Sequence, residues 1–446
     1  MIEFILNDTS DRQSMSGSSP FETTIDYGIE IKKRDDATAE WKLLDPTDRQ
    51  TFNNRIDLYF QNKGVIDFKL PEVIKGKNLF LLEKEISAQI MEGNGLKILA
   101  IEELNHSSSL LELLENAENT EQIRELYRLR KRTVSSEKNS GINAAEANKL
   151  KNCMRQGREL YLSGYAGTFM VKPLSLFYSL TAYAYAIVIL NNPLRYALES
   201  LPGSHGLNYL PADTKIQFGG DIKQGTFSEL FTSFPTFKVI YKRASIVQNN
   251  KDSIMAFYNT RMTVGIGTLL SMVPEIRGYF NLVTGRLSRT FPLDLQTVSD
   301  ARGASWEFQI GDGESRPSHI DIENSFTGFT HTERHGKTCV TVPLLEASKI
   351  KATIYTDIRG RLWYIENPFY PLILPELCLH FLLINSYSNI MRYSPDQWGD
   401  ILLNHVKSDI SLITRKYLSA FETKFPTLLL RSFSNYFPYV PSNGSE

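Results

Sequence analysis

Hydrophobic and polar residues alternate along the first hundred residues in the way that is typical of β-strands. In such a pattern every second side chain lies on one face of a sheet, and turn residues separate one run from the next. The predicted strands are IEFIL, TTIDYGIEIKK, GVIDFKL, NLFLLEKEIS and LKILAIEEL. The polar tract from Asp11 to Pro20 predicts a loop. We therefore expect a strand-rich N-terminal domain over residues 1–103.

The spacing becomes helical after about Asn105. The run LLELLENAENTEQIRELYRLRKR carries Leu, Ile and Tyr at helical spacing, with charged residues on the other face. The polar stretch TVSSEKNSGINAAEANK follows it and predicts a loop that leads into the next helix. Residues 104–144 are thus expected to form a helical connector.

Two helical regions enclose a second strand-rich zone. Residues 150–201 predict helices, whereas the zone from about Thr214 to Trp363 is rich in turn sequences such as FGGD and GDGE. Residues 368–433 predict helices again, with Pro375 in a first turn and a break at Ser394-Pro395 before a helix near Asp396. This order predicts an α+β fold, in which residues 145–446 form a domain of buried helices with an antiparallel strand-rich insert.

One segment is long enough to cross a membrane. Residues 173–194 carry no charge, and about 20 apolar residues can span a bilayer. However, the segment contains Ser, Thr and Tyr side chains, and the Asn-Asn-Pro sequence that begins at Asn191 ends it early. We therefore predict a helix that is buried on all sides in the protein core, and no membrane partner.

Composition points to a globular protein without an obvious charged partner. The 446 residues are 42% hydrophobic and 22% charged, and 49 basic against 50 acidic residues leave a net charge of −1. Such a balance gives no general attraction to nucleic acids or membranes. The three cysteines lie far apart, which argues against a disulfide framework or a cysteine-rich zinc site. The first residues lack the features of a signal peptide, so we expect the cytoplasm.

The stretch FTHTERHGKTC raises the question of a metal site. His331, Glu333, His335 and Cys339 occupy alternate positions, which share one face on an extended strand. A tight turn at His335-Gly336 is the simpler interpretation, because glycine readily adopts a positive φ. The turn would remove His335 from the face of its neighbours and leave too few converging ligands. We predict a hairpin, with no bound metal and no cofactor.

A second candidate site is a pattern typical of metal-dependent nucleases. Glu30 and Lys32 lie two apart in IDYGIEIKKR, and Asp11 lies upstream. In nucleases of the restriction type, such carboxylates hold Mg²⁺ and the lysine assists the attacking water. An amphipathic strand with one solvated face explains the same pattern. The nuclease therefore stays an alternative function.

Two further patterns have a functional and a structural interpretation. The basic run of Arg128, Arg130, Lys131 and Arg132 could contact a phosphate backbone, or could be the solvated C-terminal end of a helix. Glu376 lies four residues before His380, a spacing that suits acid–base chemistry, although a buried core histidine gives the same pattern. The chain has no phosphate-binding loop, nucleophile elbow or HExxH motif, which favours a non-catalytic protein.

Five segments of the helical regions occur in an order that resembles the YaaC-like proteins of bacteria. They are RQGRELYLSG, KPLSLFYSL, GSHGL, DIKQGTFSELF and LPELCLHFLLINSYSNIMRYSPDQW. The last is the most specific, because an LPE-started helix ends in an arginine-tyrosine pair that is followed by proline and tryptophan. The resemblance covers about residues 145–434. The matching residues that could form a binding site, or instead hold the architecture, are Arg158, Lys172, His205, Glu376, Arg392 and Trp398.

The resemblance implies a function by association, since some members look like components of bacterial antiviral gene clusters, alongside ATPases and nucleases. Our leading hypothesis is a cytoplasmic, non-catalytic scaffold or sensor subunit of such a defence complex. Its partner would be another protein subunit, an ATPase or a nuclease of the same operon, with nucleic acid as a further partner or with the chain as a homo-oligomer. The alternatives are the metal-dependent nuclease and a nucleic-acid-binding module.

Overall fold

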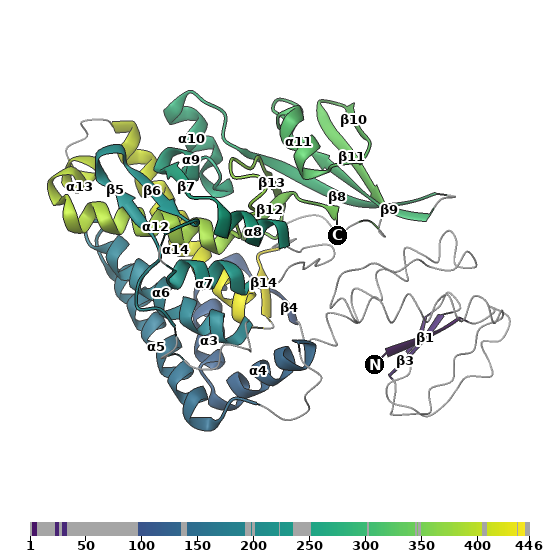
Figure 1. Ribbon diagram of the computed structural model, residues 1–446, viewed down its shortest axis with the longest axis horizontal. Helices are drawn as coiled ribbons and strands as arrows, with labels where there is room; N and C mark the ends of the chain where they lie inside the picture. The colour runs from purple at the N-terminus through teal and green to yellow at the C-terminus, as the bar shows by residue number, and fades with distance from the viewer. Residues whose placement is uncertain are drawn as a thin grey trace.

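The computed structural model describes most of the chain from residue 97 onward and three short strands before it (Figure 1). The described residues are 2–6, 23–25, 29–33, 97–134, 141–191, 198, 201–222, 224–234, 251–300, 303–343, 346, 349–403, 408–434 and 436–441.

The three N-terminal strands form one antiparallel sheet in the order β1-β3-β2. They are β1 (Ile2–Leu6), β2 (Thr23–Ile25) and β3 (Ile29–Lys33). The strand predicted for IEFIL is confirmed, and the segment TTIDYGIEIKK contains two strands. The strands predicted for GVIDFKL and NLFLLEKEIS, and the loop predicted at residues 11–20, lie outside the described residues.

The predicted helical connector contains two helices. A short 3-10 turn, η1 (Glu103–Asn105), leads into α3 (His106–Ala117), and α4 (Thr120–Val134) follows after a break. The single helical run predicted from the sequence is interrupted because Asn119 starts a new helix, with its Oδ1 accepting a hydrogen bond from the Glu121 amide at 2.8 Å.

The next helix begins earlier than the sequence pattern predicts. Helix α5 (Ala144–Ala166) starts inside the polar stretch that was predicted to be a loop. Asn143 caps it, because its side chain accepts a hydrogen bond from the Glu146 amide at 2.8 Å. An Asn side chain can therefore begin a helix within a stretch that lacks apolar periodicity.

Helix α6 (Lys172–Asn191) is the predicted buried helix. Among the described residues it is the one helix long and apolar enough to cross a membrane, but 78% of its apolar window is buried within the protein. Helix α5 packs closely along it at Gly157, where an added Cβ would lie 2.6 Å from the Tyr183 ring. The prediction of a core helix is confirmed.

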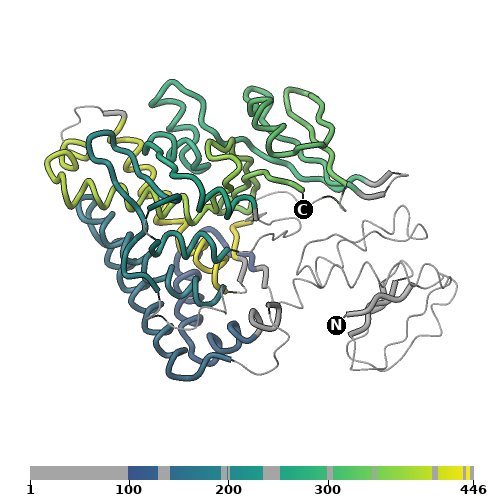
Figure 2. Tube along the Cα trace, viewed as in Figure 1, coloured from purple at the N-terminus to yellow at the C-terminus, as the bar shows by residue number. Residues whose placement is uncertain are grey.

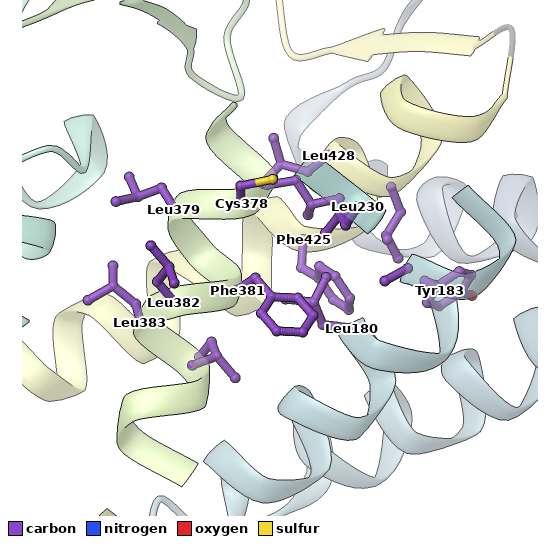
Figure 3. Close-up of a cluster of buried hydrophobic side chains, with 14 of the residues drawn as sticks. Leu180, Tyr183, Leu230, Cys378, Leu379, Phe381, Leu382, Leu383, Phe425 and Leu428 are labelled. Carbon is purple, nitrogen blue, oxygen red and sulfur yellow. The ribbon is translucent and has the colours of Figure 1, made fainter. Parts of the chain in front are cut away.

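Three C-terminal helices complete the core. They are α12 (Glu376–Tyr393), α13 (Pro395–Leu402) and α14 (Ser408–Phe433). The predicted break at Ser394-Pro395 is confirmed, and α13 begins at that proline. Figure 3 shows side chains of α6, α12 and α14 meeting in the core, among them Leu180, Phe381 and Phe425.

The zone between these helical regions contains two antiparallel sheets. A three-stranded sheet has the order β5-β6-β7, and a six-stranded sheet has the order β10-β11-β9-β8-β13-β12. The strands are β5 (Asn208–Leu210), β6 (Lys215–Phe218), β7 (Met262–Gly265), β8 (Thr290–Asp300), β9 (Gly303–Ile310), β10 (His331–Arg334), β11 (Lys337–Pro343), β12 (Thr353–Thr356) and β13 (Leu362–Ile365).

Short helices also occur in this zone, where the sequence predicted strands and turns. They are η3 (Pro211–Asp213), α7 (Thr226–Ser233), α8 (Lys251–Asn259), α9 (Ile266–Leu270), η4 (Pro274–Ile276), α10 (Arg277–Thr284) and α11 (His319–Ser325). Each is at most nine residues long, so it shows too few apolar positions to reveal a period of 3.6 residues. The expected α+β class is nevertheless confirmed.

The predicted hairpin at FTHTERHGKTC is confirmed. Strands β10 and β11 pair in antiparallel register, with Arg334 opposite Lys337. The two residues of the turn, His335 and Gly336, have φ values of 50° and 73°. Positive φ at both positions is the arrangement that two-residue hairpin turns favour.

A parallel strand pair joins the two ends of this part of the chain. Strand β4 (Lys97–Ala100) pairs with β14 (Tyr436–Tyr439), so that Lys97 lies opposite Tyr436. Figure 2 shows the blue start of this region beside the yellow C-terminal segment. The pairing holds α14 and the helices that follow β4 in one unit.

Candidate functional site

The residues nominated by the sequence fall into four separate places in the structure. Arg158 lies on α5 and forms a bidentate ion pair with Glu118, with Nε–Oε1 at 2.7 Å and Nη2–Oε2 at 3.1 Å. Glu118 ends α3, so the pair joins α3 to α5. The bond to Glu118 raises the pKa of Arg158 and keeps the guanidinium charged.

Lys172 and Trp398 both form bonds at the start of α6. The Lys172 ammonium is 2.6 and 2.8 Å from the two carboxylate oxygens of Glu422, and both side chains are about nine-tenths buried. The Trp398 indole N–H donates to the carbonyl of Met170 at 3.0 Å. Both residues therefore connect the start of α6 to the C-terminal helices.

His205 and Arg392 approach each other near the C-terminal end of α12. The His205 ring meets Phe177 edge-on, with centroids 4.8 Å apart, and its backbone carbonyl accepts from Phe227 at 3.0 Å. Burial and the charge of Arg392 lower the pKa of His205, so its ring is neutral. Arg392 itself stacks on exposed Tyr393, with its guanidinium carbon 4.9 Å from the ring centroid.

Glu376 belongs to a buried ionic centre that the sequence did not predict. We define this centre as Glu275, Glu376, Lys424 and Arg431, which come from η4, α12 and α14. The Lys424 ammonium lies between the two carboxylates: it is 2.5 Å from Glu275 and forms a short bond to Glu376. The Lys424 side chain is 1% exposed. Two acidic and two basic groups thus lie together inside the core.

The protonation of the buried ionic centre is shifted by its surroundings. Burial raises the pKa of Glu376 to about 7, with Glu275 adding to the effect and Lys424 opposing it. Burial lowers the pKa of Lys424, but the two carboxylates outweigh it and the net shift is upward. Burial lowers the pKa of Arg431 to about 10, which leaves it charged at neutral pH. An ammonium occupies the place between the carboxylates where a cation would bind.

His380, four residues after Glu376, is a core residue. Its Nδ1 lies 3.3 Å from the Tyr417 hydroxyl, and its ring packs on Tyr417 and Phe421. Burial and Lys424 lower its pKa well below the usual value, so it is neutral. Glu376 and His380 therefore have different partners, and the spacing reflects core packing.

The helix that supplies most of these partners contains a proline. Pro426 lies inside α14 and has no N–H, so the carbonyl of Glu422 four residues earlier lacks its helical partner. The Tyr161 hydroxyl donates to that carbonyl at 3.0 Å.

One signal in the sequence could have revealed that α14 carries buried charges. Glu422 and Lys424 are the charged residues of the mainly apolar run AFETKFPTLLL.

The candidates for nuclease and nucleic-acid chemistry are only partly within the described residues. Glu30 and Lys32 lie on β3, where Glu30 is opposite Ile5 of β1 and Lys32 is opposite Glu3. Asp11 lies outside the described residues. Arg128 is at the surface of α4 and pairs with Glu125. Arg130, Lys131 and Arg132 lie within the last five residues of that helix, and their side chains are outside the described residues.

Within the part of the chain that the structure describes, no three His, Cys, Asp or Glu side chains gather as metal ligands. The six nominated residues likewise do not converge on a single site. Four of them, Arg158, Lys172, Glu376 and Trp398, make specific bonds between elements that are distant in sequence. The arrangement therefore consists of side-chain bonds that connect one helix to another.

The sequence model described as YaaC-like Protein matches residues 112–433. The chain belongs to the YaaC-like family. The family match begins within α3 and ends at the last residue of α14, so it includes the second half of α3 and all of α4, in addition to nearly all of the region of the resemblance. All four members of the buried ionic centre lie within it. No curated protein and no solved structure matches the chain.

Proposed function

We propose that this YaaC-like protein is a non-catalytic scaffold or sensor subunit of a bacterial multiprotein complex. One observation carries the proposal: the family-matched charged residues Lys172 and Glu376 are neutralised within the core by Glu422 and Lys424 of α14. Groups that are committed to each other in this way hold the fold together and are not free for a substrate. The buried charged residues would then stabilise the fold, and the function of the chain would be to bind a partner.

The proposed partner is another protein subunit, an ATPase or a nuclease encoded beside this chain. Assignment to an antiviral defence complex in the cytoplasm extends the proposal and rests on the family resemblance. The structure supports only the location away from a membrane: α6, the one described helix long and apolar enough to cross a membrane, is packed in the core.

The Arg392–Tyr393 pair is the proposed contact with that partner. Tyr393 is 71% exposed, and Arg392 stacks on it at the end of α12. Tyr and Arg are the residue types that contribute most to protein–protein interfaces. Tyr393 directly follows Arg392 in the segment that carries the resemblance, and it is exposed, whereas Trp398 and Lys172 are buried.

The test is native mass measurement of the chain after gentle purification from cells that also express its neighbouring genes. We expect a complex of fixed stoichiometry with a second protein. Tyr393→Ala should release the partner without unfolding the chain. Tyr279→Ala is the matched control, because Tyr279 is also exposed and lies 4.9 Å from a cation, Lys416. That variant should keep the complex.

A lone chain or a simple homo-oligomer in this measurement would contradict the proposal. Mg²⁺-dependent cleavage of DNA or RNA that disappears in both Glu30→Ala and Lys32→Ala would replace it with the nuclease alternative. Nucleic-acid binding that falls steeply with salt and depends on Arg128, Arg130, Lys131 and Arg132 would favour the binding module.

A further inference from the structure

Two histidines from different elements face each other at the edge of the six-stranded sheet. His319 is the first residue of α11 and His331 is the first residue of β10. Their Nε2 atoms are 2.9 Å apart, and their ring centroids are 4.7 Å apart at an angle of 68°. Spacing along the chain placed His331 only with residues of its own hairpin and gave no sign that His319 is its neighbour.

The tertiary structure fixes the relative position of the two elements. Helix α11 is capped by Ser318 and is anchored by Phe326 directly after it, whose ring packs on Phe308 of β9 at 5.1 Å. Strand β10 is held in register by β11, with His331 opposite Val340. The approach of the two rings therefore follows from the packing of α11 and the hairpin against the same sheet.

A carboxylate orients one of the rings. The Nδ1 of His319 lies 3.4 Å from an oxygen of Glu323, one helical turn further along α11. A carboxylate at this place favours a proton on Nδ1, which leaves the Nε2 lone pair directed at His331. Metal-binding histidines typically have such a partner on the nitrogen that does not bind the metal.

We propose that His319 and His331 form a binding site for one divalent transition-metal ion such as Cu²⁺ or Ni²⁺. The two Nε2 atoms would be the ligands, and His331 would carry its proton on Nδ1 when the ion is bound. With metal–nitrogen bonds of about 2.0–2.1 Å, a separation of 2.9 Å gives an angle of about 90° at the metal. This is the angle between neighbouring ligands in square or octahedral coordination.

The surroundings leave the other coordination positions to water. The His319 side chain is 67% exposed, so an ion there keeps contact with solvent. Glu333, which shares the strand with His331, is paired with Arg316 and is not needed as a ligand. Imidazole ligands select transition metals over Mg²⁺, and affinity should follow the order Cu²⁺ above Ni²⁺ above Co²⁺.

The test is calorimetric titration of the full chain, without a histidine tag, with Ni²⁺, together with electron paramagnetic resonance of the Cu²⁺ form. We expect one ion per chain and a Cu²⁺ spectrum with two imidazole nitrogens. His319→Gln and His331→Gln should each weaken binding about tenfold or more, and the double variant should lose little beyond either one.

His335→Asn is the matched control. His335 is exposed at the tip of the same hairpin, four residues from His331, and asparagine tolerates its positive φ. This variant should bind as the natural chain does. Glu323→Gln keeps both ligands and should still weaken binding about tenfold.

Unchanged binding in His319→Gln or His331→Gln would overturn the proposal, as would an equal loss in His335→Asn or no binding to the natural chain. If a histidine variant does not fold, Glu323→Gln decides, because unaltered affinity in that variant would contradict the proposed arrangement. The site is independent of partner binding, so it can be present or absent whatever the outcome for the complex.

Discussion

Tyr161 donates its hydroxyl to the backbone carbonyl of Glu422 at 3.0 Å, although 261 residues separate the two. The carbonyl needs this donor because Pro426 has no N–H to offer it. The same Glu422 binds Lys172 through its carboxylate. One residue of α14 is therefore bonded through its backbone to α5 and through its side chain to α6.

Replacing Tyr161 with Phe should lower the free energy of unfolding by about 1–3 kcal/mol, because a buried carbonyl is left without a donor. The matched control is Tyr183→Phe on α6. The Tyr183 hydroxyl is buried, and no described residue bonds to it, so its removal should be neutral or stabilising. Urea denaturation measures both variants, and equal losses would contradict the assigned role of Tyr161.

Lys172→Met should destabilise the protein by about 3–5 kcal/mol, because it leaves the Glu422 carboxylate buried and unpaired. The double variant Lys172→Met, Glu422→Met should recover most of the loss, since both charges are then gone. Lys349→Met, which breaks the exposed pair with Glu346, should cost less than about 1 kcal/mol. Denaturant titrations of the four proteins give the comparison. A double variant as unstable as Lys172→Met alone would contradict a charge effect.

Stability should fall as pH rises through the pKa of Glu376. Its folded-state pKa of about 7 lies above the ordinary 4.5, so the folded chain holds this proton more tightly than the unfolded chain. The resulting stabilisation is full below the ordinary pKa and is lost as pH rises through about 7. Asp321, whose pKa burial raises to about 6, contributes in the same direction.

Glu376→Gln should make the decline between about pH 5 and 8 shallower, because the amide cannot titrate. Glu346→Gln, at a solvent-exposed carboxylate, should leave the decline unchanged. Unfolding free energies from urea titrations across this range provide the measurement. Identical slopes in the natural chain and in Glu376→Gln would show that another group is responsible.

Gly225→Ala should destabilise the protein by about 3 kcal/mol or more, at the upper end of the cost of overpacking. An added Cβ would lie 2.1 Å from the amide nitrogen of Gly206 and 2.5 Å from the carbonyl carbon of His205. Backbone atoms cannot move aside as the end of a flexible side chain can. Gly203→Ala, in the segment that also contains His205 and Gly206, is the control, because its Cβ would meet no atom within 4 Å. Thermal unfolding should separate the two variants clearly, and similar midpoints would contradict this contact.

Local patterns in the sequence were sufficient for the long elements and for the sharp turn. The charge-free run of α6, the helical spacing of α12 and the turn at His335-Gly336 each depend on neighbours within a few residues. The helix start at Ala144 does not follow from such patterns, because a capping Asn rather than apolar spacing sets the boundary. Helices α7 to α11 do not follow from them either, because five to nine residues are too few to show a helical period.

The sequence by itself determined the α+β class, the buried character of α6, the hairpin at His335-Gly336 and, through ordered motifs, the family. Only the tertiary structure decided that Glu376 faces Lys424, that Lys172 faces Glu422 and that His319 meets His331. The physical reason is the range of the interactions. Periodicity and turn geometry are set by residues close along the chain, whereas a buried ion pair or a pair of ligands depends on which helices and strands the core brings together.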